Sequence, residues 1–180
     1  MNDQALVDFW FSQQTSQYWF NSTPEFDQQL RESYADLWQQ AQLGELDNWR
    51  ETAIGSLALV ILLDQIPLNI FRGKPESFVT EAQSIIVARA AIDKGFDDEL
   101  TQRQKSFLYM PFMHSENLQD QAFALAVFDQ PGLEDNFRFA KHHYALVEQF
   151  GRFPHRNEIL GRQSSQAEIE YLNSKQAFKG

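Results

Sequence analysis

The sequence predicts an all-α protein. Apolar residues recur at spacings of three and four over most of the 180 residues, which places them on one face of an α-helix. Capping residues and helix-terminating glycines stand at the ends of several of these segments. No segment alternates apolar and polar residues between hairpin turns, as half-buried strands do. Together these observations predict about eight helices, paired in antiparallel hairpins, in a single domain over residues 1–180.

The second predicted helix has the clearest boundaries. Before it, the apolar residues of 6–10 predict a short first helix. Thr23 is a suitable N-cap for the second, and Pro24 suits the first helical position, where its missing N–H costs nothing. One apolar stripe follows, and Gly44 supplies the stop. The stripe is formed by Phe26, Leu30, Tyr34, Leu37 and Ala41.

A third helix is expected to start at the cap Thr52 and to run up to Pro67. Its residues are apolar nearly all round, which predicts the central buried helix. A fourth helix is expected over residues 78–92, with its end near Gly95.

Capping signals continue in the second half of the chain. Thr101 and Gln104 form a capping box for a fifth helix, which we expect Pro111 to break. Helices over 118–128 and 134–150 follow, and Gly151 is the expected stop of the latter. A short helical turn is expected at Pro154. The last helix is expected after the capping box formed by Ser165 and Glu168.

Composition narrows the classes of function. The formal net charge is -10, and the chain contains no cysteine. An acidic protein is a poor partner for the nucleic-acid backbone, and without cysteine there are no disulfides and no thiolate metal ligands. The first residues are acidic and polar, unlike a signal peptide. The longest apolar run, residues 54–63, reaches about half of a membrane crossing. We therefore expect a soluble, cytoplasmic protein that binds neither nucleic acid nor membrane.

Polar residues interrupt the most apolar helix. Asp64 and Gln65 follow a run of aliphatic residues, and a buried carboxylate must be paired or hydrogen-bonded. Arg72 is the nearest candidate partner in the sequence. These residues predict one of three arrangements: a structural Asp–Arg bridge, Asp64 as a cap of backbone N–H groups near Pro67, or part of a ligand site.

A second polar group follows Tyr109 and Pro111. His114, Ser115 and Glu116 are consecutive, so they cannot share one helix face, although they could converge in a loop. Ser115 and His114 suggest a nucleophile and a base, but adjacent residues rarely reach that geometry. Glu116 could instead complement the N-terminus of a helix that Asn117 caps.

The third group is basic within an acidic chain. Arg152, His155, Arg156 and Asn157 surround Pro154, where a helical turn would leave backbone N–H groups free for an anion. Guanidinium forks suit phosphate or carboxylate, and histidine titrates near neutral pH. The competing interpretation is that these arginines pair with carboxylates of the chain itself.

We expect the second and third groups to meet at one electropositive cavity. In this interpretation His114, Glu116 and His155 are the candidate acid–base residues. The sequence contains no phosphate-binding glycine loop, no nucleophile elbow and no histidine pair at metal-ligand spacing, so we expect no cofactor and no metal. The candidate ligand-binding residues are Asp64, Gln65, Arg72, Tyr109, Ser115, Arg152, Arg156 and Asn157.

Four stretches resemble the bacterial family known as domain of unknown function 924. They are residues 7–11, 62–73, 107–116 and 150–162, and residues 19–27 are also similar. The resemblance covers nearly the whole chain. It implies an all-α fold related to tetratricopeptide-type helical hairpins, and it implies no activity. The chain departs from the family pattern at Ile66, where an aromatic residue is usual, and at Leu68, near which a basic residue is usual.

Two functions remain open from the sequence. The first is a pocket for a small anionic molecule, with or without an enzymatic reaction. The second is a scaffold of stacked helical hairpins that presents a groove to a protein partner. No 34-residue repeat is visible to support the second. Convergent, partly buried polar residues would favour the first, and a broad exposed groove would favour the second.

Overall fold

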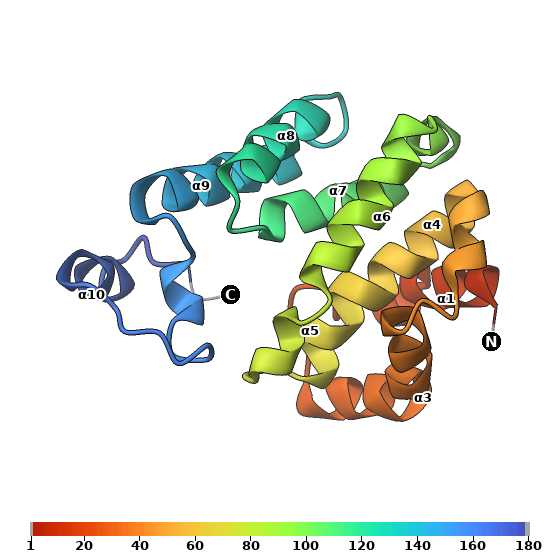
Figure 1. The fold of residues 1–180 in the computed structure, drawn as a ribbon, viewed down its shortest axis with the longest axis horizontal. Coiled ribbons are helices and arrows are strands. Elements are labelled where there is room, and N and C mark those ends of the chain that lie inside the picture. Colours follow the sequence, from red (N-terminus) through yellow and green to blue (C-terminus); the bar gives the residue numbers. More distant parts are fainter. Residues whose placement is uncertain (1, 179–180) are drawn as a thin grey trace. The chain divides into compact units, whose positions relative to one another are not determined.

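The computed structural model describes residues 2–178, and within them every regular element is helical (Figure 1). Contacts divide the chain into two compact units. Unit 1 comprises the residues up to Arg72 together with Glu76–Pro111, and unit 2 comprises Gly73–Pro75 and the residues from Phe112 onward. Each unit is described by itself below. The all-α fold class is confirmed, and the single domain stays a prediction.

Unit 1 is built around a helix that is almost completely buried. This helix consists of α4 (Ala53–Val60), a π-helical turn η2 (Ile61–Gln65) and α5 (Ile66–Ile70). Around it lie α1 (Asp3–Phe11), α2 (Gln13–Ser16), α3 (Pro24–Gln42), α6 (Glu81–Asp93) and the 3₁₀ turns η1 (Asp47–Glu51), η3 (Pro75–Phe78) and η4 (Phe96–Glu99). The first residues of α7 (Gln102–His114) also belong to this unit.

The starts of two predicted helices, at Thr23 and Thr52, are where the sequence placed them, whereas the fourth helix, expected from residue 78, begins at Glu81. Thr23 Oγ1 accepts the N–H of Phe26, and Thr52 Oγ1 accepts the N–H of Gly55. Each bond satisfies a donor that a helix start leaves without a partner in the helix. The starts of α3 and α4 were therefore predicted correctly from local chemistry.

Two expected helix ends were wrong, and both involve proline. The chain stays helical beyond Pro67, and Pro111 lies inside α7. Pro67 has no N–H for the carbonyl of Leu63 four residues earlier, which is why a proline usually ends a helix. Here the hydroxyl of Thr80 donates to that carbonyl oxygen at 2.6 Å. A donor from another element therefore replaces the missing N–H and lets the helix continue.

Thr80→Val is expected to lower the free energy of unfolding by about 2 kcal/mol, because a buried carbonyl and a part-buried indole N–H lose their partner. The valine leaves the Leu63 carbonyl and the indole N–H of Trp38, which Thr80 Oγ1 also accepts at 3.2 Å, without the hydroxyl. Urea unfolding measures the change. Thr80→Ser keeps the hydroxyl and is the control. Equal stability of Thr80→Val and the wild type would show that the hydroxyl is dispensable.

The central helix also has the length and composition of a membrane span. Residues Ala53–Ile70 have a mean hydropathy of 1.8, but 89% of this stretch is buried inside the fold. The core helix of a soluble protein meets the same criteria of length and composition.

Unit 2 contains a helical pair and a polar C-terminal region. The pair is α8 (Leu118–Phe128) and α9 (Glu134–Phe150), which pack along each other (Figure 1). The short turn η5 (Pro154–Arg156) and α10 (Gln166–Leu172) follow. Phe153 is fully buried against Leu146 and Val147 of α9. This packing holds the loop after α9 in place, and the loop carries four of the predicted site residues, namely Arg152, His155, Arg156 and Asn157.

Candidate functional site

The predicted site residues are distributed over both units. Unit 1 contains Asp64, Gln65, Arg72 and Tyr109, and unit 2 contains His114, Ser115, Glu116, Arg152, His155, Arg156 and Asn157. The two groups are therefore described separately.

Asp64 and Gln65 lie in the π-helical turn of unit 1. Asp64 is buried, with an exposed fraction of 4%, as its place in an apolar helix predicts. The side-chain amide of Gln65 donates to Asp64 Oδ2, and the side-chain amide of Asn69 donates to the carbonyl of Gln65 at 3.0 Å. Buried polar groups in this turn thus hydrogen-bond to one another, as burial requires.

The predicted bridge between Asp64 and Arg72 is wrong. Arg72 instead pairs with Asp27 of α3, with Nε 2.7 Å from Oδ2, and also donates to Asn69 Oδ1 at 3.0 Å. The reason is distance along the helix. Asp64 lies in the π-helical turn, whereas Arg72 lies beyond the end of α5 at Ile70, about two helical turns further along the axis. The guanidinium therefore joins the C-terminal end of α5 to α3.

Tyr109 is a buried residue of α7, with an exposed fraction of 2%. Its hydroxyl donates to Asp97 Oδ2 at 2.7 Å, which ties α7 to η4. A buried tyrosine normally finds such a partner. This contact is structural in character.

In unit 2 a carboxylate joins the loop after α7 to the loop after α9. Glu116 Oε1 accepts the backbone N–H of Phe153 at 2.8 Å and Arg162 Nη2 at 2.8 Å, and Oε2 accepts Arg162 Nη1 at 2.6 Å. Burial raises the pKa of Glu116, but the hydrogen bonds from Arg162 and Phe153 outweigh burial and lower the pKa overall. Both oxygens of Glu116 are engaged, so the carboxylate is held in its ionised form.

Arg162 is fixed by further bonds within the same loop. Its Nε donates to Asn157 Oδ1 at 3.0 Å, and its backbone N–H donates to the carbonyl of Asn157 at 2.7 Å. The side-chain amide of Asn157 donates to Ser164 Oγ at 3.0 Å. Asn157, predicted as a ligand-binding residue, is 1% exposed and holds the loop together.

Arg156 brings the two predicted groups of unit 2 close together. Its Nη2 donates to the backbone carbonyl of His114 at 2.8 Å, and its guanidinium lies over the ring of Phe153, 4.8 Å from the centroid. The residues around His114 and those around His155 therefore lie side by side, although about forty positions separate them in the sequence.

Ser115 contributes to the start of α8. Its hydroxyl donates to Asp120 Oδ2 at 2.9 Å and accepts the N–H of Asn117 at 3.1 Å. If Ser115 were a nucleophile, a base would have to remove its hydroxyl hydrogen. In the structure this hydrogen is directed to the carboxylate of Asp120 in α8. Asn117 caps α8, as the sequence predicts, by accepting the N–H groups of Gln119 and Asp120.

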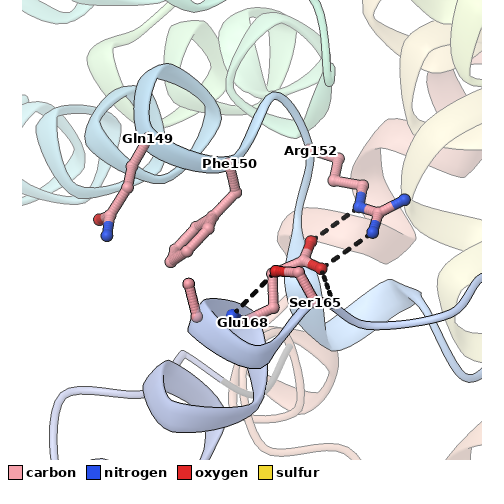
Figure 2. A pocket seen from close by; sticks show the side chains of 6 residues that line it. Gln149, Phe150, Arg152, Ser165 and Glu168 are labelled. Carbon is pink, nitrogen blue, oxygen red and sulfur yellow. Dashed lines mark hydrogen bonds and ion pairs between the residues drawn. The ribbon is translucent and has the colours of Figure 1, made fainter.

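Arg152 forms a two-pronged ion pair with Glu168. Nε lies 2.7 Å from Oε1 and Nη2 lies 2.9 Å from Oε2, and Nη2 also donates to the carbonyl of Gln163 at 2.9 Å. Hydrogen bonds from Arg152 lower the pKa of Glu168 to about 2. Glu168 also closes the predicted capping box with Ser165 (Figure 2). Here an arginine does pair with a carboxylate of the chain, as the competing interpretation holds.

A shallow depression adjoins this ion pair. Its volume is about 380 Å³. Figure 2 shows the ring of Phe150 and the side chain of Gln149 on one side and the Arg152–Glu168 pair on the other. The lining residues are Gln149, Phe150, Arg152, Ser165, Ala167 and Glu168. Among the predicted site residues, Arg152 is the one that lines it.

His155 packs between aromatic rings. Its ring centroid is 5.6 Å from that of Phe153 and 5.1 Å from that of Phe178. Burial and the neighbouring charge of Arg156 lower the pKa of His155 to about 4, so the imidazole is neutral at pH 7. Within residues 2–178, His155 Nδ1 is buried and has no hydrogen-bond partner.

Several residues of this region were not predicted from the sequence. Arg162 lies within a stretch that resembles the family, but no spacing ties it to Glu116. Glu168 was recognised for its cap and not for its pairing with Arg152. His143 is 5% exposed, and burial lowers its pKa to about 3. Across the described part of the chain, no three His, Asp or Glu side chains are grouped as metal ligands.

Comparisons with known proteins agree with this fold. A family model described as a bacterial protein of unknown function, DUF924, matches residues 6–176. A solved structure from Agrobacterium tumefaciens, the protein of unknown function ATU0120, is 36% identical. The match covers 95% of this chain and 96% of that one, with a TM-score of 0.90. Comparison with curated proteins finds no match.

Proposed function

We propose, for a chain that belongs to the DUF924 family of bacterial proteins of unknown function, that unit 2 binds a small anionic ligand beside Arg152. One observation carries the proposal. The guanidinium is held in place by hydrogen bonds, but one of its three nitrogens can still donate to a ligand. Glu168 and Gln163 engage its Nε and Nη2 groups. Within residues 2–178 the two hydrogens on Nη1 have no partner, and Figure 2 shows this third nitrogen on the side away from Glu168.

The chemistry of the depression supports a ligand that is partly apolar. Phe150 and Ala167 supply apolar surface, while Gln149, Ser165 and Arg152 supply polar groups. Ligand sites commonly combine an apolar wall with a few oriented polar groups, in volumes of about 300–1,000 Å³. An orientated guanidinium suits a carboxylate or phosphate because it loses little freedom on binding.

Glu168 limits the affinity that we expect. The Glu168 carboxylate faces the guanidinium of Arg152 and is only 3% exposed, and its negative charge balances the positive charge of Arg152. A ligand anion would therefore gain from directed N–H donors more than from net charge. We expect dissociation constants on the order of millimolar for simple anions.

Butyrate is expected to bind the wild type, whereas butanamide, which has a similar shape and no charge, is expected to bind at least about fivefold more weakly. NMR titration measures both affinities and should shift the backbone amides of residues 149–152 and 165–168. Gln149→Glu adds a negative charge at an exposed lining position and should weaken butyrate binding by a similar factor. Arg138→Ala, which removes an exposed arginine elsewhere on α9, is the control.

Equal affinities for butyrate and butanamide, or butyrate binding that Gln149→Glu leaves unchanged, would contradict the proposed site. Arg152→Lys provides a second test, because lysine keeps the charge and loses the planar fork. We expect this variant to bind butyrate more weakly than the wild type does.

Binding, rather than a reaction, is the activity that the contacts favour. A catalytic carboxylate needs an oxygen available to the substrate, and both oxygens of Glu116 are engaged. The candidate acid–base residues His114 and His155 do not line the depression, so a reaction that uses them would need a site elsewhere in unit 2.

A tetratricopeptide-like scaffold for a protein partner is the second candidate function. The helical pair α8 and α9 and the exposed side chains of Phe139 and Ile169 favour it, since stacked helical hairpins bind peptides along exposed surfaces. A peptide that shifts NMR signals along α8 and α9, and not those of residues 149–152, would favour the scaffold. For either function we propose a cytoplasmic location, without nucleic-acid or membrane partners.

A further inference from the structure

The C-terminal segment of unit 2 places the ring of Phe178 among three imidazoles. Its centroid lies 4.6 Å from that of His143, 5.1 Å from that of His155 and 6.2 Å from that of His142. Phe153 lies behind His143 and His155, at 5.3 Å and 5.6 Å. We call the surroundings of Phe178, formed by His142, His143, His155 and Phe153, the imidazole socket.

The geometry of the imidazole socket selects a planar ring. The planes of the three imidazoles make angles of 65–82° with the ring of Phe178, the edge-to-face arrangement that aromatic pairs favour. His143 cannot easily turn, because its Nδ1 is bonded to the backbone carbonyl of Phe139 at 2.9 Å. The walls of the socket are therefore formed by α9, by Phe153 and by η5.

Phe178 fills the socket without meeting its hydrogen-bonding capacity. His155 Nδ1 is buried and, among residues 2–178, has no partner. A phenyl ring has no group to offer it, and a buried polar atom without a partner is costly. A phenolic hydroxyl both donates and accepts, so it can satisfy Nδ1 in either neutral tautomer. A phenol therefore suits the socket better than the side chain that occupies it.

The segment that carries Phe178 is held by hydrogen bonds to residues close to it in the sequence and by the packing of Phe178 against the cluster of Leu146, Val147 and Phe153. Residues 173–176 are exposed, and the backbone N–H of Phe178 donates to Tyr171 Oη at 2.8 Å. Ordering such a segment costs conformational entropy, which offsets the gain from burying one ring. A ligand can therefore compete with Phe178 for the same place.

We propose that the imidazole socket is a binding site for small phenolic molecules, and that Phe178 occupies it as an internal competitor. This site is distinct from the depression beside Arg152 and does not rest on the proposed anionic ligand. Removing the ring of Phe178 should raise the measured affinity of the socket for a phenol. The measured affinity of a site is lowered by the fraction of molecules in which the site is occupied by an internal competitor.

The test compares phenol with toluene in wild-type protein and in Phe178→Ala, by NMR titration. Phenol is expected to bind Phe178→Ala at least about tenfold more tightly than the wild type. In that variant phenol should bind at least about fivefold more tightly than toluene, which has a similar shape and no hydroxyl. Adding His155→Phe should abolish this preference. Phe139→Ala removes an exposed phenylalanine elsewhere on α9 and is the matched control.

Equal phenol affinity in wild type and Phe178→Ala would overturn the proposal. Equal affinity of Phe178→Ala for phenol and toluene would also overturn it, because the variant would then contain an engineered apolar cavity only. If Phe178→Ala does not fold, amide hydrogen exchange of the wild type decides. Phenol should accelerate exchange at residue 178 by releasing its bond to Tyr171, and unchanged exchange at saturating phenol would contradict the proposal.

Discussion

Lowering the pH from 7.5 to 5 is expected to reduce the free energy of unfolding by about 3–4 kcal/mol through two histidines of unit 2. Burial lowers the pKa of His143 to about 3, and burial with the charge of Arg156 lowers that of His155 to about 4. An unfolded histidine has a pKa near 6.5. Between these values the unfolded chain binds more protons than the folded protein, so stability rises with pH.

The sign and the pH window follow from these values. Above pH 6.5 both histidines are neutral in both states, and their full contribution to stability is present. It is lost as the pH falls from 6.5 toward 4 for His155 and toward 3 for His143, at about 1.4 kcal/mol per pH unit for each group. Glu168, with a pKa of about 2, adds a further loss as the pH falls below 4.5.

Urea unfolding at pH 7.5, 6 and 5 measures this dependence. His143→Leu and His155→Phe should each remove about half of the slope between pH 6.5 and 5, because neither replacement titrates. Arg138→Ala, an exposed substitution on α9, should keep the full slope. A stability that is flat over this range would mean that the two imidazoles protonate equally well in both states.

Glu116→Ala is expected to destabilise the protein by about 3 kcal/mol. The alanine leaves the N–H of Phe153 and two donors of Arg162 without their acceptor, and the loss of one partner from a buried pair is costly. The expected loss is smaller than for a fully buried ion pair, because the side chains of Glu116 and Arg162 are each 24% exposed. Solvent therefore screens the charge that remains on Arg162. Thermal or urea unfolding at pH 7 measures the change.

A double-mutant cycle separates the ion pair from the backbone contact. Glu116→Ala and Arg162→Ala should show a coupling of about 1–2 kcal/mol. Glu116→Gln keeps an acceptor for Phe153 and should cost less than the alanine. The control is Asp135→Ala, because the Asp135–Arg138 pair is 84% and 71% exposed and should contribute less than about 1 kcal/mol. Similar losses for Glu116→Ala and Asp135→Ala would show that the contacts of Glu116 with Phe153 and Arg162 are unimportant.

Local signals in the sequence predicted the helix starts, and long-range contacts decided the rest. Thr23, Thr52, Asn117 and the Ser165–Glu168 box act within one helical turn, so neighbouring residues suffice to recognise them. The expected end at Pro67 failed because its compensating donor, Thr80, lies thirteen positions away and in another element. Nothing near the proline indicates that donor.

The same distinction holds for the candidate site. The residue types at 114–116 and 152–157 indicated that the two segments are polar and adjacent to helix ends. Their partners could not be read from spacing, because Arg162 meets Glu116 across 46 positions and Glu168 meets Arg152 across 16. The imidazole socket could not be predicted from the sequence for the same reason, because Phe178 lies far from His143 in the sequence and contacts it only in the folded protein.

The π-helical turn at Ile61–Gln65 changes the rotational phase of everything that follows it in the helix. One additional residue in a turn rotates the subsequent side chains by about 100° about the axis relative to an uninterrupted α-helix. The orientation of Arg72 toward Asp27 of α3, and of Asn69 toward Arg72, therefore depends on this extra residue. Shortening the turn by one residue would leave the amino-acid composition of the helix almost unchanged and still turn Arg72 away from Asp27. For this reason a homologous sequence that lacks the extra residue has to be aligned with a one-residue gap here, since an ungapped alignment would assign the wrong face to the helical residues from Ile66 to Ile70.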